Sequence, residues 1–136
     1  MQNGPMSTEI SPQSIARPAA NYAHAMLSDS ATRWLHTSGV VPIAPDGSVP
    51  AAIGEQATVV WANIVAMLEE ADLRAEDVVS VTTYVVHSAT LADDLPAVMS
   101  ARDKALGGHR AASTLVTVPA LVRPEWKMEI AIVACR

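Results

Sequence analysis

The sequence predicts an α+β fold in which one mostly antiparallel sheet carries two helices on one face. Two observations support this class. Apolar residues recur at steps of three and four through residues 53–68, which is the stripe of an amphipathic helix. Runs dense in β-branched residues, typical of strands, flank a second helical segment. The predicted order is therefore β-β-α-β-α-β-β.

The first half of the chain supplies a strand, a turn and a helix. "RWLHTSGVV" (33–41) suits a strand, and "APDGS" (44–48) is a turn centred on Asp46-Gly47. The helix is expected over 53–73. Its apolar stripe consists of Ile53, Ala57, Val60, Trp61, Ile64 and Leu68.

The second half repeats the alternation. Residues 77–86 read as a strand, and the second helix is expected over 90–108. Thr90 is a candidate cap for that helix, and Gly107-Gly108 ends it. The last two strands are predicted at 112–121 and 127–135, with a turn between them at 123–125.

Composition bounds the domain organisation. At 136 residues the chain is expected to form a single domain over 16–136, after a polar, Ser/Pro-rich mobile arm at 1–15. There is no Phe and there are only five Trp and Tyr together, so the core must use Val, Ala, Leu, Ile and Met. Burial per residue is then modest, and oligomerisation is expected to add stability.

Charge and cysteine content exclude several function classes. The net charge is −5 and no block of Lys or Arg is present, which argues against a nucleic-acid partner. Cys135 is the only cysteine, so an internal disulfide and a multi-cysteine metal site are excluded. Neither a signal-peptide pattern nor an apolar run of membrane-spanning length is visible. We expect a cytoplasmic protein without a membrane partner.

Two charged residues are candidates for chemistry. Glu129 interrupts an apolar strand, so it either lies on a wet face beside a cation or acts on water in a desolvated cleft. Arg110 follows the Gly-Gly helix stop and is either an anion hook or a surface loop residue. The sequence has no P-loop, nucleophile elbow or paired metal histidines.

Several short motifs, spread over about residues 15–136, together resemble those of a known protein family. Read in order, the chain resembles the RidA (YjgF/YER057c/UK114) family of reactive-imine deaminases. The motifs are Asn21 to Ala25, Thr37-Ser38-Gly39, Glu55-Gln56 with Asn63, Ala112-Ser113-Thr114, and Leu121 with Arg123-Pro124-Glu125 and Met128-Glu129-Ile130.

The resemblance implies a chorismate-mutase-like (YjgF-like) fold assembled as a homotrimeric barrel, with substrate clefts between subunits. It implies hydrolysis of small 2-imino acids, such as 2-iminobutanoate and 2-iminopropanoate, to 2-oxo acids and ammonia. It implies no metal and no organic cofactor, because an iminium carbon is already electrophilic and the site need only orient substrate and water.

Carried over residue by residue, the resemblance makes Tyr22 a cleft residue, Ser38 and Gly39 the cleft floor, and Glu129 the holder of the attacking water. The family's carboxylate-gripping arginine stands in an Ala-Arg-Ser pattern. Aligning Ala112 and Thr114 with that pattern puts Ser113 in the arginine's place.

Two more positions depart from the family pattern. Val40 stands where a Gln is usual, and Leu95 lies near an expected Asn. The pocket is therefore expected to lack the carboxylate grip unless Arg110 swings in, which predicts an altered substrate range. Two functions remain open: a RidA-like hydrolase acting on an imine, enamine or related metabolite, and a non-catalytic trimer that binds a small metabolite in the same clefts. A nuclease is disfavoured by the acidic chain.

Overall fold

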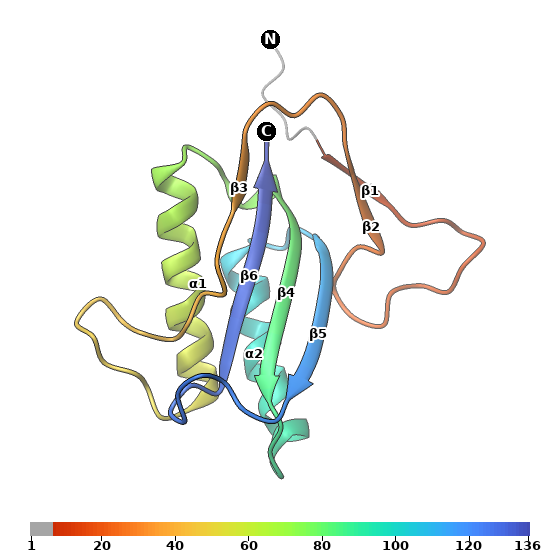
Figure 1. The fold of residues 1–136 in the computed structure, drawn as a ribbon. Helices are drawn as coiled ribbons and strands as arrows, with labels where there is room; N and C mark the ends of the chain where they lie inside the picture. The colour runs from red at the N-terminus through yellow and green to blue at the C-terminus, as the bar shows by residue number, and fades with distance from the viewer. Residues whose placement is uncertain (1–6) are drawn as a thin grey trace.

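A computed structural model describes residues 7–136 of the chain (Figure 1). In that range a four-stranded sheet has the order β3-β6-β4-β5. Its strands are β3 (Trp34–His36), β6 (Met128–Cys135), β4 (Val78–Val86) and β5 (Ala112–Val118). β6 is antiparallel to both β3 and β4, whereas β4 and β5 are parallel.

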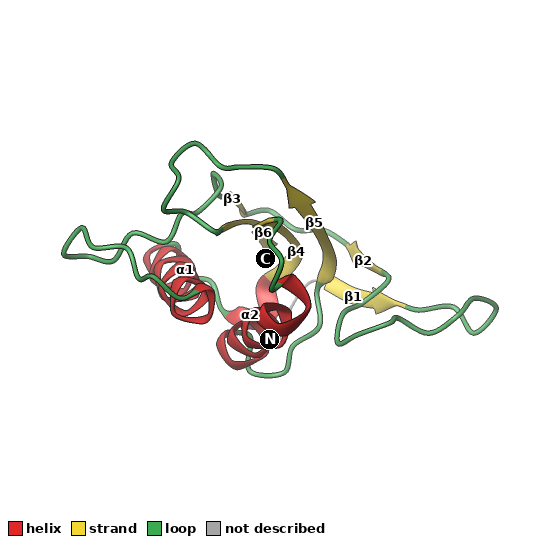
Figure 2. Cartoon of the chain, turned by 90° about the horizontal axis from the view of Figure 1, so that it is seen from below, coloured by secondary structure: helices red, strands yellow, loops and turns green. Residues whose placement is uncertain are grey.

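Each helix is a crossover between parallel strands. α1 (Ile53–Glu70) leads from β3 to β4, with β6 inserted between them, and α2 (Leu91–Ala105) leads from β4 to β5. Parallel strands need such long connections, because a tight turn joins only antiparallel ones. Seen end-on in Figure 2, both helices cover the same side of the sheet. The predicted α+β class, with a mostly antiparallel sheet and two helices on one face, is confirmed.

The core lies between the sheet and the helices. Alternate residues of β4 and β6, including Val81, Val85, Ile130 and Ile132, are buried toward the helices. They meet the predicted apolar stripe of α1, every member of which is buried. The residues between them in β4 and β6 form the opposite, helix-free face of the sheet.

The predicted first strand, 33–41, is broken by a bulge. His36 pairs with Val133 and Val40 pairs with Ile130, so the three residues 37–39 lie opposite two residues of β6. The Thr37 hydroxyl accepts the Ile132 N–H at 3.0 Å, which satisfies an amide that the bulge would otherwise leave unpaired.

The predicted turn at 44–48 forms as expected. Gly47 has a φ of +87°, and Ala44 N–H donates to Ser48 O at 2.8 Å. The hydroxyl and the backbone N–H of Ser48 both donate to Asp46, and these bonds lower the pKa of the Asp46 carboxyl.

The helix ends differ in detail from their predictions. α1 stops at Glu70 because Asp72 turns into the left-handed region at φ +56°, where Leu73 N–H bonds back to Leu68 O. Thr90 precedes α2 but makes no capping bond to its backbone. Its hydroxyl donates instead to the Asp94 carboxylate at 2.8 Å.

A separate two-stranded ribbon precedes the main sheet in the chain. β1 (Ser7–Ile10) pairs antiparallel with β2 (Ala25–Ser28). The predicted arm at 1–15 contained no strand and no strand was assigned to residues 25–28, so the sequence analysis missed both strands of the ribbon. Residues 1–6 lie outside the described residues. The ribbon packs over Cys135, whose Sγ lies 3.3 Å from Ser28 Oγ.

The helix–sheet contact predicts a large cost for truncating its centre. Ile64 is fully buried in α1, so Ile64→Ala removes three carbon atoms and leaves a cavity. The free energy of unfolding should fall by about 3 kcal/mol. Urea denaturation at a fixed protein concentration measures this, with exposed Glu69→Gln as the control. A loss below about 1 kcal/mol would mean that α1 does not pack as described.

Candidate functional site

Glu129 lies on the helix-free face of the sheet. It pairs in register with Tyr84 of β4, which pairs with Val116 of β5, so the three side chains share that face. The neighbouring β6 residues Met128 and Ile130 point the other way and are buried. Glu129 is itself half-buried, which places its carboxylate at the boundary between protein and solvent.

The bulge at 37–39 brings backbone directly under this carboxylate. A Cβ atom built on Gly39 would lie 1.8 Å from Glu129 Oε2, far closer than any real contact. Gly39 is therefore required for space rather than for an unusual backbone angle. The reciprocal bonds of Val40 and Ile130, at 2.7 and 3.1 Å, hold the two segments together beside this contact.

Within residues 7–136, the Glu129 carboxylate has neither a hydrogen-bond donor nor a cationic partner. The backbone N–H groups of Ser38 and Gly39, both exposed, also find no acceptor in that range. A carboxylate acceptor thus lies beside two open amide donors. Such an arrangement can hold a water molecule on the carboxylate and a polar substrate atom on the amides.

A second cluster gathers around Arg110. Its Nη2 donates to Tyr22 O at 2.6 Å and lies 3.3 Å from Glu9 Oε2. Tyr22 is held near the start of β5, because Ala23 N–H donates to Ala111 O at 3.0 Å. Arg110 Nε is buried and has no acceptor among the described residues. Arg110 also lines a cavity of about 590 Å³ beneath the loop that connects β1 and β2.

The two clusters lie toward opposite edges of one sheet. Glu129, Ser38 and Gly39 belong to the β3–β6 side, whereas Tyr22 and Arg110 adjoin β5. β4 separates β5 from β6, and two strand spacings amount to about 10 Å. Within one chain, the structure brings together the members of each cluster but does not join the two clusters.

The register also places the residues that depart from the family pattern. Thr114 pairs with Thr82 and so shares the Glu129 face, whereas Ser113 pairs with buried Val81 and faces the helices. Val40 is buried in the core, and Leu95 of α2 packs against the same core. Within this chain Val40 and Leu95 therefore lie on the opposite side of the sheet from Glu129.

Gln56 is a residue whose part the sequence analysis did not foresee. It is fully buried in α1 and makes three hydrogen bonds to backbone groups outside the helix. Its Nε2 donates to Pro50 O and Glu125 O, both at 2.8 Å, and its Oε1 accepts Lys127 N–H at 2.9 Å. The signal available in the sequence was a polar residue next to Ala57 on the buried side of the helix.

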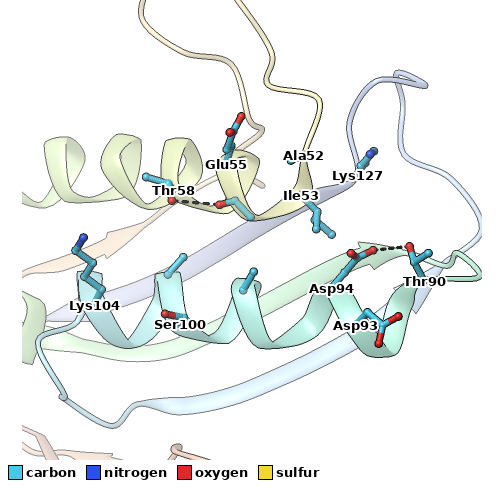
Figure 3. A pocket seen from close by; sticks show the side chains of 13 residues that line it. Ala52, Ile53, Glu55, Thr58, Thr90, Asp93, Asp94, Ser100, Lys104 and Lys127 are labelled. Carbon is cyan, nitrogen blue, oxygen red and sulfur yellow. Dashed lines mark hydrogen bonds between the residues drawn. The ribbon is translucent and has the colours of Figure 1, made fainter.

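A further groove, of about 650 Å³, runs between α1 and α2 on the helix side of the sheet (Figure 3). Carboxylates and lysines mix along it, and its threonines are engaged locally: Thr58 donates to Gly54 O, and Thr90 donates to Asp94. It lies away from Glu129. In residues 7–136 no group of three His, Cys, Asp or Glu side chains is placed to hold a metal ion, and no helix there could cross a bilayer.

The contact between Gly39 and Glu129 predicts the effect of one added methyl group. In Gly39→Ala the flexible carboxylate end has to move, whereas the backbone can stay, so the fold should persist and the Glu129 side chain should turn away. A crystal structure of the variant measures this. Ser38→Ala, at the exposed neighbouring position, is the control. An unmoved Glu129 above a shifted residue 39 would contradict the prediction.

Comparisons with known proteins agree with this fold. The Endoribonuclease L-PSP family model matches residues 13–136. YyfB from Yersinia pestis, a Rid-family protein of unknown function, is 29% identical with a TM-score of 0.83, over 96% of this chain and 99% of that one. The YjgF gene product of E. coli is 28% identical with a TM-score of 0.68, over 98% of this chain and 94% of that one.

YEO7 from yeast is 27% identical with a TM-score of 0.65, over 95% of this chain and 98% of that one. No curated protein matches the sequence. With the family model spanning nearly all of the described residues, and with Rid and YjgF proteins as its structural relatives, the chain belongs to the Endoribonuclease L-PSP family, which includes RidA and YjgF.

Proposed function

We propose that the protein hydrolyses a small reactive imine, enamine or related metabolite in clefts between subunits, with Glu129 positioning the water. Membership of the RidA/YjgF family supports a small-metabolite function. The observation that carries the finer proposal is the Glu129 carboxylate, which lies against Gly39 with both oxygens free of protein partners in residues 7–136.

The chemistry needs few groups. Glu129 accepts a hydrogen bond from a water molecule, whose oxygen attacks the imine carbon while the carboxylate takes up the released proton. The carboxylate passes this proton to the nitrogen of the tetrahedral adduct and then accepts the proton of the adduct's hydroxyl as the carbonyl forms. The carbon–nitrogen bond breaks in the same step, and the second proton also goes to the departing nitrogen, which leaves as ammonia. The sum is an imine plus water giving a carbonyl compound plus ammonia. The open N–H groups of Ser38 and Gly39 are suited to orient an oxygen of the substrate.

Substrate carboxylate binding would fall to Arg110 in this proposal. Its guanidinium is already shared between Glu9 and the Tyr22 carbonyl, so it would grip a carboxylate less strongly than a free arginine. This supports a substrate range that differs from that of ordinary 2-imino acids. The net charge of −5 does not favour RNA as the substrate, whatever the family's description.

Assembly would join the two clusters. The helix-free face exposes Val116 beside Tyr84 and, toward the other end of β6, Trp34 beside Cys135. A monomer rarely leaves such apolar surface in water. Packing three copies through these faces would bring the β5 side of one subunit toward the Glu129 side of the next. Each cleft would then contain Arg110 and Tyr22 from one copy and Glu129 and Gly39 from another.

The assembly prediction is a homotrimer. Three chains of 14.3 kDa give a mass of about 43 kDa. Light scattering at micromolar concentration measures the mass, and Val116→Lys, which places a charge on the same face, should shift it toward the monomer. A wild-type mass near that of one chain would contradict the shared clefts.

The catalytic prediction concerns Glu129→Gln. The amide keeps the shape of the side chain but cannot take the proton from water, so kcat/KM should fall by at least about a hundredfold. The assay generates imines enzymatically and follows their loss by semicarbazide trapping. Glu125→Gln, which changes an exposed carboxylate four residues away, should retain full activity.

Two outcomes would count against hydrolysis. Equal turnover by Glu129→Gln and wild type would show that Glu129 does not position the water. A wild-type protein that binds such metabolites without accelerating their hydrolysis would identify the non-catalytic binding protein instead.

A further inference from the structure

The geometry points to Gln56 as a positioning residue for Glu129, acting through the backbone rather than by touching the substrate. The inference rests on the proposed function, because it assigns to Gln56 the task of keeping the water-holding carboxylate over Gly39. Gln56 projects from α1, on the helix side of the sheet, and Glu129 lies on the other face. A direct role in the cleft is therefore excluded by geometry.

The three hydrogen bonds of the Gln56 side-chain amide involve both its nitrogen and its oxygen. Both N–H donors of Nε2 find carbonyl oxygens, and Oε1 receives a backbone N–H. The side chain is 0% exposed, so water cannot replace these partners in the folded state. An apolar side chain of the same size would remove the hydrogen-bond partner of one backbone N–H and of two backbone carbonyls in these part-buried segments.

The partners of Gln56 belong to two chain segments that adjoin the candidate site. Glu125 and Lys127 lie just before β6, and Lys127 is two residues from Glu129. Pro50 closes the loop that leaves the bulge after Val40. One side chain thus ties the start of the Glu129 strand to the loop that leads from the Gly39 bulge to α1.

The bridge between Val40 and Ile130 completes this linkage. Their reciprocal backbone bonds join the same two segments next to Gly39 and Glu129. If Gln56 no longer holds Lys127 and Pro50, the strand start and the loop can move independently. The Glu129 carboxylate then loses its fixed place above Gly39, where a Cβ built on that glycine would lie 1.8 Å from Glu129 Oε2.

The kinetic test compares Gln56→Met with wild type. Methionine keeps the length and the burial of the side chain but removes all three bonds. We expect kcat to fall by about tenfold, which is about 1.4 kcal/mol, while KM changes by less than about twofold, because the substrate-binding groups lie elsewhere. Thr58→Val, which removes a bond within the same helix and touches neither loop, should keep wild-type kcat.

A hydrogen-exchange measurement on the assembled protein tests the same inference without an activity assay. In Gln56→Met the amides of Val40, Lys127 and Ile130 should exchange at least about tenfold faster, whereas amides in the middle of β4, such as Val81, should stay protected. This pattern would support positioning even if no imine proved to be a substrate, in which case only the proposed function would fail.

Other outcomes would overturn the inference. Uniformly faster exchange through β4 and β6 would show that Gln56 stabilises the whole fold without a local task. Unchanged exchange at Val40 and Ile130 would show that their bridge holds without it. A wild-type kcat in a stably folded Gln56→Met variant would show that Glu129 keeps its place unaided.

Discussion

The space above Gly39 is the constraint on which the candidate site depends. A carboxylate can lie there only because residue 39 has no side chain and because a bulge brings that residue under β6. The bulge in turn needs Thr37 to satisfy the Ile132 amide and needs Val40 to resume pairing with Ile130. A change at any of these points would move the same pair of atoms, the Glu129 oxygen and the Gly39 α-carbon.

Helix α1 helps to hold β6 and the neighbouring loops in place from the other face of the sheet. α1 supplies the apolar stripe that seats β6, and from the same side it extends Gln56 to the loops at the end of the sheet. Because β6 lies between the two strands that α1 connects, it is paired along both edges and cannot slip easily. A side chain on such a central strand, as Glu129 is, is held more firmly than one on a loop would be.

The spacing of apolar residues, every second residue in strands and every third or fourth in helices, was enough to predict both helices, β4 and β6. They failed where pairing is not periodic. The bulge at 37–39 cuts the predicted first strand short, and β1 has too few apolar residues to stand out. Glu129 was identified because alternation put a carboxylate on one face of an apolar strand. Which side Ser113 faces could not be read in the same way, because it depends on the register between β4 and β5, a tertiary property.

The β1–β2 ribbon has a consequence for the one thiol of the chain. Cys135 ends β6 and is fully buried, with its sulfur 3.3 Å from the hydroxyl of Ser28 and 3.5 Å from that of Ser7, one from each strand of the ribbon. Alkylating reagents therefore reach the sulfur only when the ribbon lifts from the sheet. The rate at which such a reagent labels Cys135 thus reports how often the N-terminal ribbon opens, and no residue has to be engineered for the measurement.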